Sequence, residues 1–245
     1  AEIFRLDADL LGETMREMPR EFTDAARLRM VVIEMPMPDG SLQRFRIEDS
    51  PILADHLAAD VPGWRTFHGY GIDDATATAR FDWTVKGFHG YILTDRGTVY
   101  IDPLQENDTE NYLVYYKHEY GRSDAGEFKC GVDDLAAKLA PIANSERPDA
   151  VNYSYGGSIR TYRLAVATTG EWSRGTTMSV DPQTVRTSAL AALTTSVNRL
   201  DGIFRVEIGS SFQIVNPSIT NDATNIIFDD PATDPYDNTD GIPQL

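Results

Sequence analysis

The stretch ATARFDWTV, residues 77–85, alternates apolar and polar side chains along its whole length. One side of a strand with this sequence carries Ala77, Ala79, Phe81, Trp83 and Val85. The other side carries Thr78, Arg80, Asp82 and Thr84. Because successive side chains of a β-strand point to opposite faces, this pattern predicts a strand in a sheet that buries one face and leaves the other in water.

Segments on both sides of this strand have the same character. Before it, VVIEMP (31–36) and a second alternating segment flank the turn sequence PDGS (38–41), which predicts a hairpin. After it, FHGYILTDRGTVYID (88–102) holds two β-prone segments around a DRG turn, and NYLVYYK (111–117) is another. We therefore expect residues 29–120 to form an antiparallel β meander, either a sandwich or an open barrel.

The residues that precede the meander read as a leader, residues 1–28, with one short amphipathic helix that ends before Pro19. Its apolar face is expected to carry Leu6, Leu10, Leu11, Met15 and Met18. A second short helix is predicted over 51–60, with Pro51 at its first position, where a missing N–H costs nothing.

Residues 121–158 are rich in glycine, proline and serine and predict a linker, in which DDLAAKLAPIA (133–143) could form a short helix. Regular structure is expected again from 159 onward. TYRLAVATTG (161–170) and SSFQIV (210–215) are predicted strands, and NIIF (225–228) is a candidate third.

A long helix is predicted between these strands. Asp181 is its expected N-cap, Pro182 its first residue and Gly209 its stop. Its apolar face is expected to carry Leu193, Val197, Leu200, Phe204 and Ile208. The result is a β-α-β unit, which cannot cover both faces of its own sheet, so we expect it to need further packing partners.

Composition excludes several classes of partner. The 22 basic and 38 acidic residues give a net charge of -16, which repels phosphate backbones and anionic membranes. No segment approaches the roughly 20 apolar residues of a membrane span. The start at Ala1-Glu2-Ile3 fits a chain trimmed after a signal peptide, and equally an arbitrary boundary.

The common catalytic motifs are absent from the sequence. No nucleophile elbow, P-loop or dinucleotide fingerprint is present, and His118-Glu119 begins an HExxH motif that fails at its last position. His68 and His89 are interpreted as ordinary surface residues of strands or turns. The acidic tail offers calcium the carboxylates of Asp229, Asp230, Asp234, Asp237 and Asp240. Their spacing departs from an EF-hand, so the pattern favours a solvated acidic loop over a calcium site.

Cys130 is the only cysteine, which excludes an internal disulfide. It lies in GEFKCGVDD (126–134), a polar segment where a buried structural thiol is not expected. Lys129 favours the thiolate, and Gly131 allows the backbone to approach another surface. A thiolate on such a tether is a good ligand for a zinc ion with an open position.

Lys129-Cys130-Gly131-Val132 resembles the cysteine switch of reprolysin-type zinc metallopeptidases, the adamalysin-like branch of the metzincins. YRLAVATTGEW and LAALTTSVNRLDGIFRVEIGSSFQIV resemble the start of the catalytic domain in bacterial members, with Asn198, Phe204 and Ile208 at matching positions. FHGYGIDDATATARFDWTVKGFHGYI is similar to their β-rich prosegments. The family's zinc motif HExxHxxGxxH and its Met-turn are not within these residues.

The resemblance implies an α+β chain in four parts. These are a leader (1–28), a β-rich prodomain (29–120), a cysteine-switch and activation linker (121–158), and an incomplete N-terminal part of the catalytic domain (159–245). It also implies a secreted zymogen in which Cys130 is the inhibitory zinc ligand and all other zinc ligands lie outside this chain. Arg147 and Arg160 are candidate activation cleavage sites.

The expected partners are the remainder of its own catalytic domain and protein or peptide substrates, with no nucleic acid and no membrane. No catalytic residue is expected in the chain, which should be inactive alone. Two other interpretations stay open. One is a non-enzymatic extracellular β-rich binding module, and the other is a trans-acting inhibitor that uses Cys130 against another protease.

Overall fold

The computed structural model describes residues 1–106, 108–120 and 158–236. The described residues of 1–119 and 159–236 belong to one compact unit. The structure does not test the predicted boundaries at 28, 120 and 158, which stay predictions.

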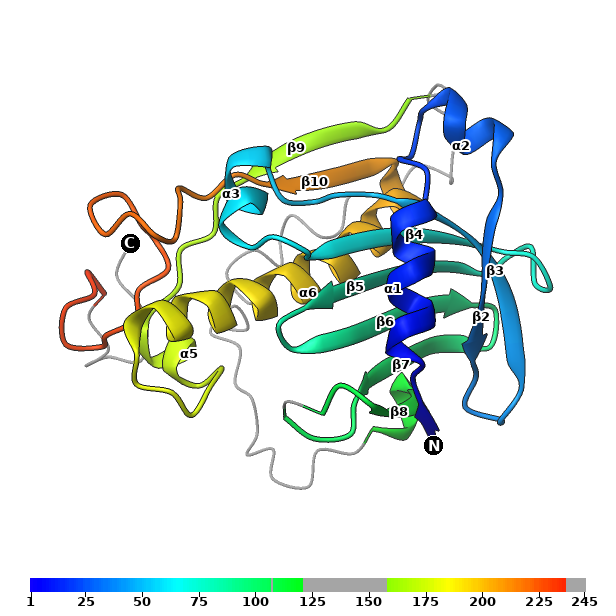
Figure 1. The fold of residues 1–245 in the computed structure, drawn as a ribbon, viewed down its shortest axis with the longest axis horizontal. Helices are drawn as coiled ribbons and strands as arrows, with labels where there is room; N and C mark the ends of the chain where they lie inside the picture. Colours follow the sequence, from blue (N-terminus) through cyan, green and yellow to red (C-terminus); the bar gives the residue numbers. More distant parts are fainter. Residues whose placement is uncertain (107, 121–157, 237–245) are drawn as a thin grey trace, which may run out of the picture. The chain divides into compact units, whose positions relative to one another are not determined.

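An antiparallel sheet is the largest feature of this unit (Figure 1). In the described part of the chain it has eight strands in the order β1-β8-β7-β6-β5-β4-β3-β2, and it curls into a half-barrel. The strands are β1 (Glu2–Arg5), β2 (Val31–Pro36), β3 (Leu42–Asp49), β4 (Arg65–Gly71), β5 (Thr78–Thr84), β6 (Gly87–Thr94), β7 (Gly97–Pro103) and β8 (Asn111–Tyr116). The predicted antiparallel meander is therefore confirmed, in the form of one curled sheet.

The helices are mostly short. They are α1 (Ala8–Glu17), α2 (Asp24–Leu28), α3 (Asp55–Asp60), the 3-10 turn η1 (Lys117–Glu119), α5 (Gly170–Arg174) and the long α6 (Pro182–Ile208). The chain is therefore α+β, as expected. No helix in the described ranges is both long and apolar enough to cross a membrane.

The predicted β-α-β unit is present as β9 (Arg160–Leu164), α6 and β10 (Ser210–Ile214), with β9 and β10 paired in parallel. The carboxylate of Asp181 accepts a hydrogen bond from the Thr184 N–H at 2.8 Å, which caps the start of α6. Gly209 ends the helix in the left-handed conformation, with φ of 64°. The capping signals in the sequence thus gave the correct ends of this helix.

Two apolar cores stabilise the unit. The first lies on one face of the half-barrel sheet, centres on Phe45, Phe81 and Ile92, and is covered by α1 through Leu11. The second includes Leu57 from α3, Leu190 from α6, Ile214 from β10, and Ile219 and Ile227. In Figure 1, α1 crosses one face of the sheet and α6 the other.

The prediction that the polar face of residues 77–85 lies in water is wrong. Arg80 and Asp82 are each 1% exposed, whereas Val85 on the predicted core face is 55% exposed. The cause is α6, which packs across the polar face of β5 and β6. The alternation of apolar and polar side chains correctly separated the two faces of the strand. It could not show that a helix more than a hundred residues later covers the polar face.

The predicted leader is part of the fold. Its strand β1 pairs with β8, and Leu11 of α1 is buried in the first core. On the predicted apolar face, Leu6, Leu11, Met15 and Met18 pack on the sheet, whereas Leu10 is 60% exposed and that part of the prediction is wrong. Residues 1–28 therefore complete one edge of the half-barrel.

Several predicted elements are shorter in the structure. The helix expected over 51–60 begins at Asp55, because Leu53 is extended and bridges to Ile214. NIIF (225–228) forms one isolated bridge, Thr168 to Ile227, and no strand.

The predicted apolar face of α6 is only partly correct. Leu193 and Val197 are buried, but Leu200 and Ile208 are exposed.

Replacement of Phe81 by alanine is expected to lower the free energy of unfolding by about 3–5 kcal/mol, because the ring is fully buried between Phe45 and Phe88. Val85→Ala on the same segment is the matched control and should cost less than about 0.5 kcal/mol. Urea unfolding followed by tryptophan fluorescence measures both. Equal losses in the two variants would contradict this packing.

Candidate functional site

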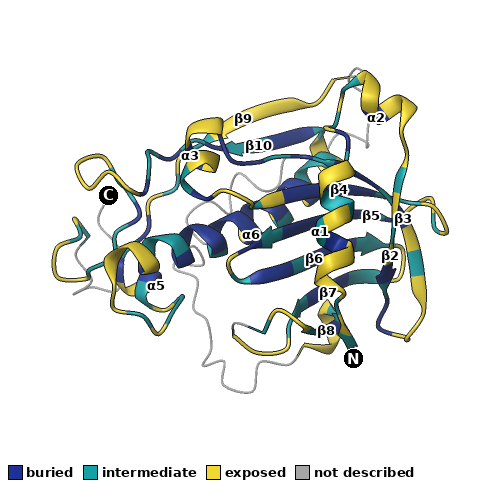
Figure 2. Ribbon diagram, viewed as in Figure 1, coloured by how far each residue is buried: buried dark blue, intermediate teal, exposed yellow. Residues whose placement is uncertain are grey.

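The contact between the half-barrel sheet and α6 is the candidate functional site. We call it the polar layer, and its members are Ser50, Arg80, Asp82, Thr195, Asn198 and Asp201. All six are buried. Figure 2 shows that much of α6 is buried where it crosses the sheet. It joins residues of the 29–120 segment to residues of the 159–245 segment.

Local geometry brings these side chains to one place. Arg80 and Asp82 are two positions apart on β5 and so share a face, which is covered by α6. Asn198 and Asp201 are three positions apart on α6 and so share a helix face. Gly202 allows the close approach, because a Cβ atom there would lie 2.8 Å from Cγ of Arg80.

Arg80 is the centre of the polar layer. Its Nε donates to Oδ1 of Asn198 at 2.8 Å, and its Nη1 donates to Oγ of Ser50 at 2.6 Å. Nη1 also lies 3.4 Å from Oδ2 of Asp201, a carboxylate with no solvent exposure. Burial lowers the pKa of Arg80 to about 10, against the opposing effect of Asp201, so the guanidinium stays charged at neutral pH. The ion pair is therefore fully removed from water.

Asp82 binds a second part of α6. Its Oδ1 accepts a hydrogen bond from the Thr195 hydroxyl at 2.8 Å, and Nδ2 of Asn198 donates to the Phe81 carbonyl at 2.9 Å. Nδ1 of His89 lies 3.3 Å from Oδ1 of Asp82, within ion-pair range, but it forms no aligned hydrogen bond. Asn198 thus forms hydrogen bonds both with a side chain of β5, that of Arg80, and with the β5 backbone at Phe81.

Asp201 extends the polar layer toward β10. Its Oδ1 accepts from the Ser211 hydroxyl at 2.7 Å and from the Phe212 N–H at 2.8 Å. Its Oδ2 accepts from Nε of Arg205 at 2.6 Å, and Arg205 in turn donates to Glu21 at 2.7 Å. One connected network therefore links the N-terminal segment, the sheet, α6 and β10.

A second ion pair lies further along the same face. Arg199 of α6 binds the Asp102 carboxylate of β7, and its guanidinium lies 4.8 Å from the ring centre of Tyr100. The Tyr115 hydroxyl also donates to Asp102, at 2.8 Å. This pair is partly exposed, so it contributes less than the buried one.

His68 borders the polar layer on β4 and is buried, so the prediction of a surface residue is wrong. Burial, with Arg80, Arg205 and Arg46 nearby, lowers its pKa from 6.5 to about 2. The ring is therefore neutral in the folded protein at every physiological pH.

The arrangement favours docking over catalysis. The Thr195 hydroxyl donates to Asp82 rather than to a histidine base, and both side chains are buried. A nucleophile needs an adjacent base and access to substrate. A buried, fully paired charge cluster instead fixes one geometry between two elements, which is the best attested use of such groups.

Those residues singled out from the sequence that the structure describes do not gather as a metal-binding group. Cys130 and the rest of 121–157 lie outside the described residues. Nε2 of His56 lies 2.8 Å from the Asn216 carbonyl oxygen, and the His118 ring stacks on Tyr116.

The described aspartates of the acidic tail have protein partners. Asp229 accepts from Nε of Arg186 at 2.6 Å, and Asp234 accepts from the Gly170 N–H at 2.6 Å. Among the described residues, no three His, Cys, Asp or Glu side chains gather as a metal site. Asp237 and Asp240 lie outside the described residues. The calcium alternative gains no support from the described part of the loop.

Comparison with protein-family models finds no match, and no curated protein is significantly similar to the chain.

Sequence reasoning missed the polar layer. The available signal was a pair of polar residues, Asn198 and Asp201, beside the apolar stripe of a long helix. A buried arginine on a strand gives no comparable signal. The alternation of apolar and polar side chains predicts that Arg80 is on the solvent-facing side of the strand.

Asp201→Asn is expected to lower the free energy of unfolding by about 3–5 kcal/mol, because it removes the carboxylate that is ion-paired with the buried Arg80. Glu207→Gln, which is exposed on the same helix, is the control and should change stability by less than about 0.5 kcal/mol. Chemical denaturation of both variants tests this. A near-neutral Asp201→Asn would mean that the buried pair is not formed.

His68 predicts a pH dependence of stability. Its folded pKa is below its unfolded value of 6.5, so the unfolded chain binds the extra proton and stability falls as the pH falls below 6.5. The expected loss approaches 1.4 kcal/mol per pH unit, roughly. Burial raises the pKa values of Glu48 and Asp49, which has the opposite effect above their unfolded values of 4.5 and 3.8.

The difference between wild type and His68→Gln isolates this histidine from the carboxylates. Unfolding curves at pH 7 and pH 5 should show a smaller loss in His68→Gln than in wild type. His118→Gln, at an exposed position, should keep the wild-type loss. If His68→Gln also keeps it, His68 is not a neutral buried ring.

Proposed function

We propose that this chain is the prosegment and the first part of the catalytic domain of a secreted zinc metalloendopeptidase zymogen. Residues 29–120 would be the prosegment body, 121–158 the cysteine-switch linker, and 159–245 the start of the protease. The support from sequence is the order of these parts and the Lys129-Cys130-Gly131-Val132 match. The support from the structure is the polar layer.

The polar layer supports the proposal by its chemistry. Contacts between parts of a protein that later separate are more polar than a shared apolar core. Here Arg80 and Asp82 come from the segment proposed as prosegment, and Asn198 and Asp201 come from the segment proposed as protease. Paired buried charges would fix the register of the two parts, beside the second apolar core in which Leu57 of the first part packs with Leu190 and Ile214 of the second.

Cys130 would maintain latency in this proposal. Zinc in the complete enzyme would supply an activated water for peptide hydrolysis. The Cys130 thiolate would occupy the water's position, and Lys129 would favour the thiolate over the thiol. In this proposal the remaining zinc ligands come from the HExxHxxGxxH motif, which is not within the 245 residues.

Cleavage within the linker would then start activation. While the linker is intact, the tether keeps the prosegment at a high effective concentration near its partner. After cleavage, the polar layer and the second apolar core would hold it. Salt would weaken retention mainly through the partly exposed Arg199–Asp102 pair, because buried pairs are screened much less.

The first test is the coding sequence beyond codon 245. The proposal expects HExxHxxGxxH there, followed by a Met-turn. Without that motif the proposal is wrong, and a binding module or a trans-acting inhibitor becomes the better reading.

The second test is activity. The purified 245-residue chain should show no zinc-dependent hydrolysis of casein. In the product of the complete gene, Cys130→Ser should hydrolyse casein without linker cleavage, whereas Ser145→Ala in the same linker should stay latent. A latent Cys130→Ser protein would refute the role of the thiol.

A further inference from the structure

The half-barrel contains an apolar cavity that the proposed function does not use. It has a volume of about 610 Å³ and lies between α1, the two edge strands β1 and β2, and the floor of the sheet. Protein interiors rarely contain voids larger than a water molecule. The cavity is instead within the range of small-molecule sites, roughly 300–1,000 Å³.

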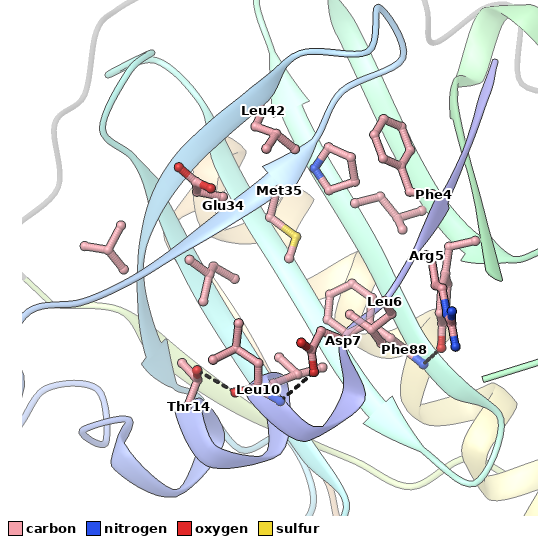
Figure 3. A pocket seen from close by; sticks show the side chains of 16 residues that line it. Phe4, Arg5, Leu6, Asp7, Leu10, Thr14, Glu34, Met35, Leu42 and Phe88 are labelled. Atoms are coloured by element: carbon pink, nitrogen blue, oxygen red, sulfur yellow. Dashed lines mark hydrogen bonds between the residues drawn. The ribbon is translucent and has the colours of Figure 1, made fainter. Parts of the chain in front are cut away.

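The floor of the cavity is apolar and deep. Phe88, Ile101 and Tyr112 form it, and each is only 2% exposed. Figure 3 shows Met35 and Phe88 directed into the cavity, with Leu10 and Thr14 approaching from α1. A flat protein surface could not reach these floor residues, whereas a slender small molecule could.

The mouth of the cavity is also apolar. Leu10, Val32 and Leu42 line it and are 60%, 39% and 54% exposed. They lie on α1, β2 and β3, so three separate elements present apolar side chains to the opening. Large apolar side chains gathered around an opening are typical of ligand-binding sites.

The polar groups in the wall are mostly engaged within the protein. The Thr14 hydroxyl donates to the Leu10 carbonyl at 2.8 Å, and the Tyr112 hydroxyl accepts from the Phe88 N–H at 3.1 Å. Asp7 caps α1 by accepting from the Leu10 N–H at 2.9 Å. The interior therefore selects a ligand body without hydrogen-bonding groups, because buried unpaired polar atoms are costly.

The charged side chains at the rim of the cavity determine which charge the polar end of a ligand can carry. Asp7 and Glu34 are exposed carboxylates at the rim, and the nearby cation, Arg5, donates to Glu110 at 3.1 Å. The rim is thus net acidic, and an anionic end would be repelled.

We infer that this cavity binds a small amphiphile with an apolar body and an uncharged or cationic end. At about 30 Å³ for each water-sized group, the volume holds a body of roughly 20 non-hydrogen atoms. The site is distinct from the polar layer, which lies on the opposite face of the sheet. It does not depend on the proposed protease function.

Three ligands with the same twelve-carbon chain test the inference on the 245-residue chain. Dodecanol, dodecyltrimethylammonium and dodecanoate compete with the neutral fluorescent probe N-phenyl-1-naphthylamine, all below micelle-forming concentrations. The probe should bind saturably, and the first two ligands should displace it. Dodecanoate should be at least about tenfold weaker, a difference of about 1.4 kcal/mol. Equal displacement by all three would overturn the charge assignment.

Variants on α1 locate the site. Thr14→Trp places an indole in the cavity and should weaken probe binding at least about tenfold. Glu13→Trp adds the same ring at the adjacent exposed position and should bind like wild type. Leu10→Glu is a second variant at the mouth, where the exposed position tolerates the change, and it should also weaken binding.

Circular dichroism and thermal unfolding confirm that each variant is folded. If Thr14→Trp is unfolded, Leu10→Glu decides alone. Probe binding that is unsaturable, or equal in Leu10→Glu and Glu13→Trp, would overturn the inference and favour a macromolecular partner for the opening.

Discussion

A buried charge constrains the architecture of this protein. The Arg80 guanidinium lies in the middle of a sheet face, 1% exposed, and removing such a cation from water costs several kcal/mol. The carboxylate of Asp201, the amide of Asn198 and the Ser50 oxygens offset that cost, together with the nearby charges of Glu21 and Asp82. The position of α6 on the sheet is therefore fixed to within a hydrogen-bond length. The absence of a side chain at Gly202 lets the helix come close enough to satisfy this requirement.

Local features of the fold were predictable, because they depend on neighbouring residues. Alternation around Phe81 indicated a strand, and Asp181 and Gly209 marked the ends of α6. The environment of the polar strand face was not predictable, since periodicity separates faces without saying what covers them. For the same reason, the sequence pattern could not identify the element that packs against the β-α-β unit. That partner is the half-barrel sheet, whose residues come much earlier in the chain.

The candidate sites differ in how far sequence alone reaches them. Cys130 is conspicuous because it is the only cysteine and has a charged, glycine-flanked setting, yet its role depends on groups outside the described residues. Arg80 and Asp201 are ordinary residues in the sequence, and only tertiary structure makes them partners. The apolar cavity is similar, because its walls come from α1 and from strands at both edges of the sheet. No short segment of the sequence contains enough residues of the polar layer or of the cavity to predict either site.

The pairing of β1 with β8 has a consequence for synthesis on the ribosome. Glu2 lies opposite Val114, so β1 leaves the ribosome more than a hundred residues before its neighbour β8. The bond between Arg80 and Asn198 closes a similarly long loop, with a separation of 118 residues. Contacts of this range slow folding. The nascent sheet would meanwhile present a polar, hydrated face to its surroundings, which protects it from aggregation until α6 has been made.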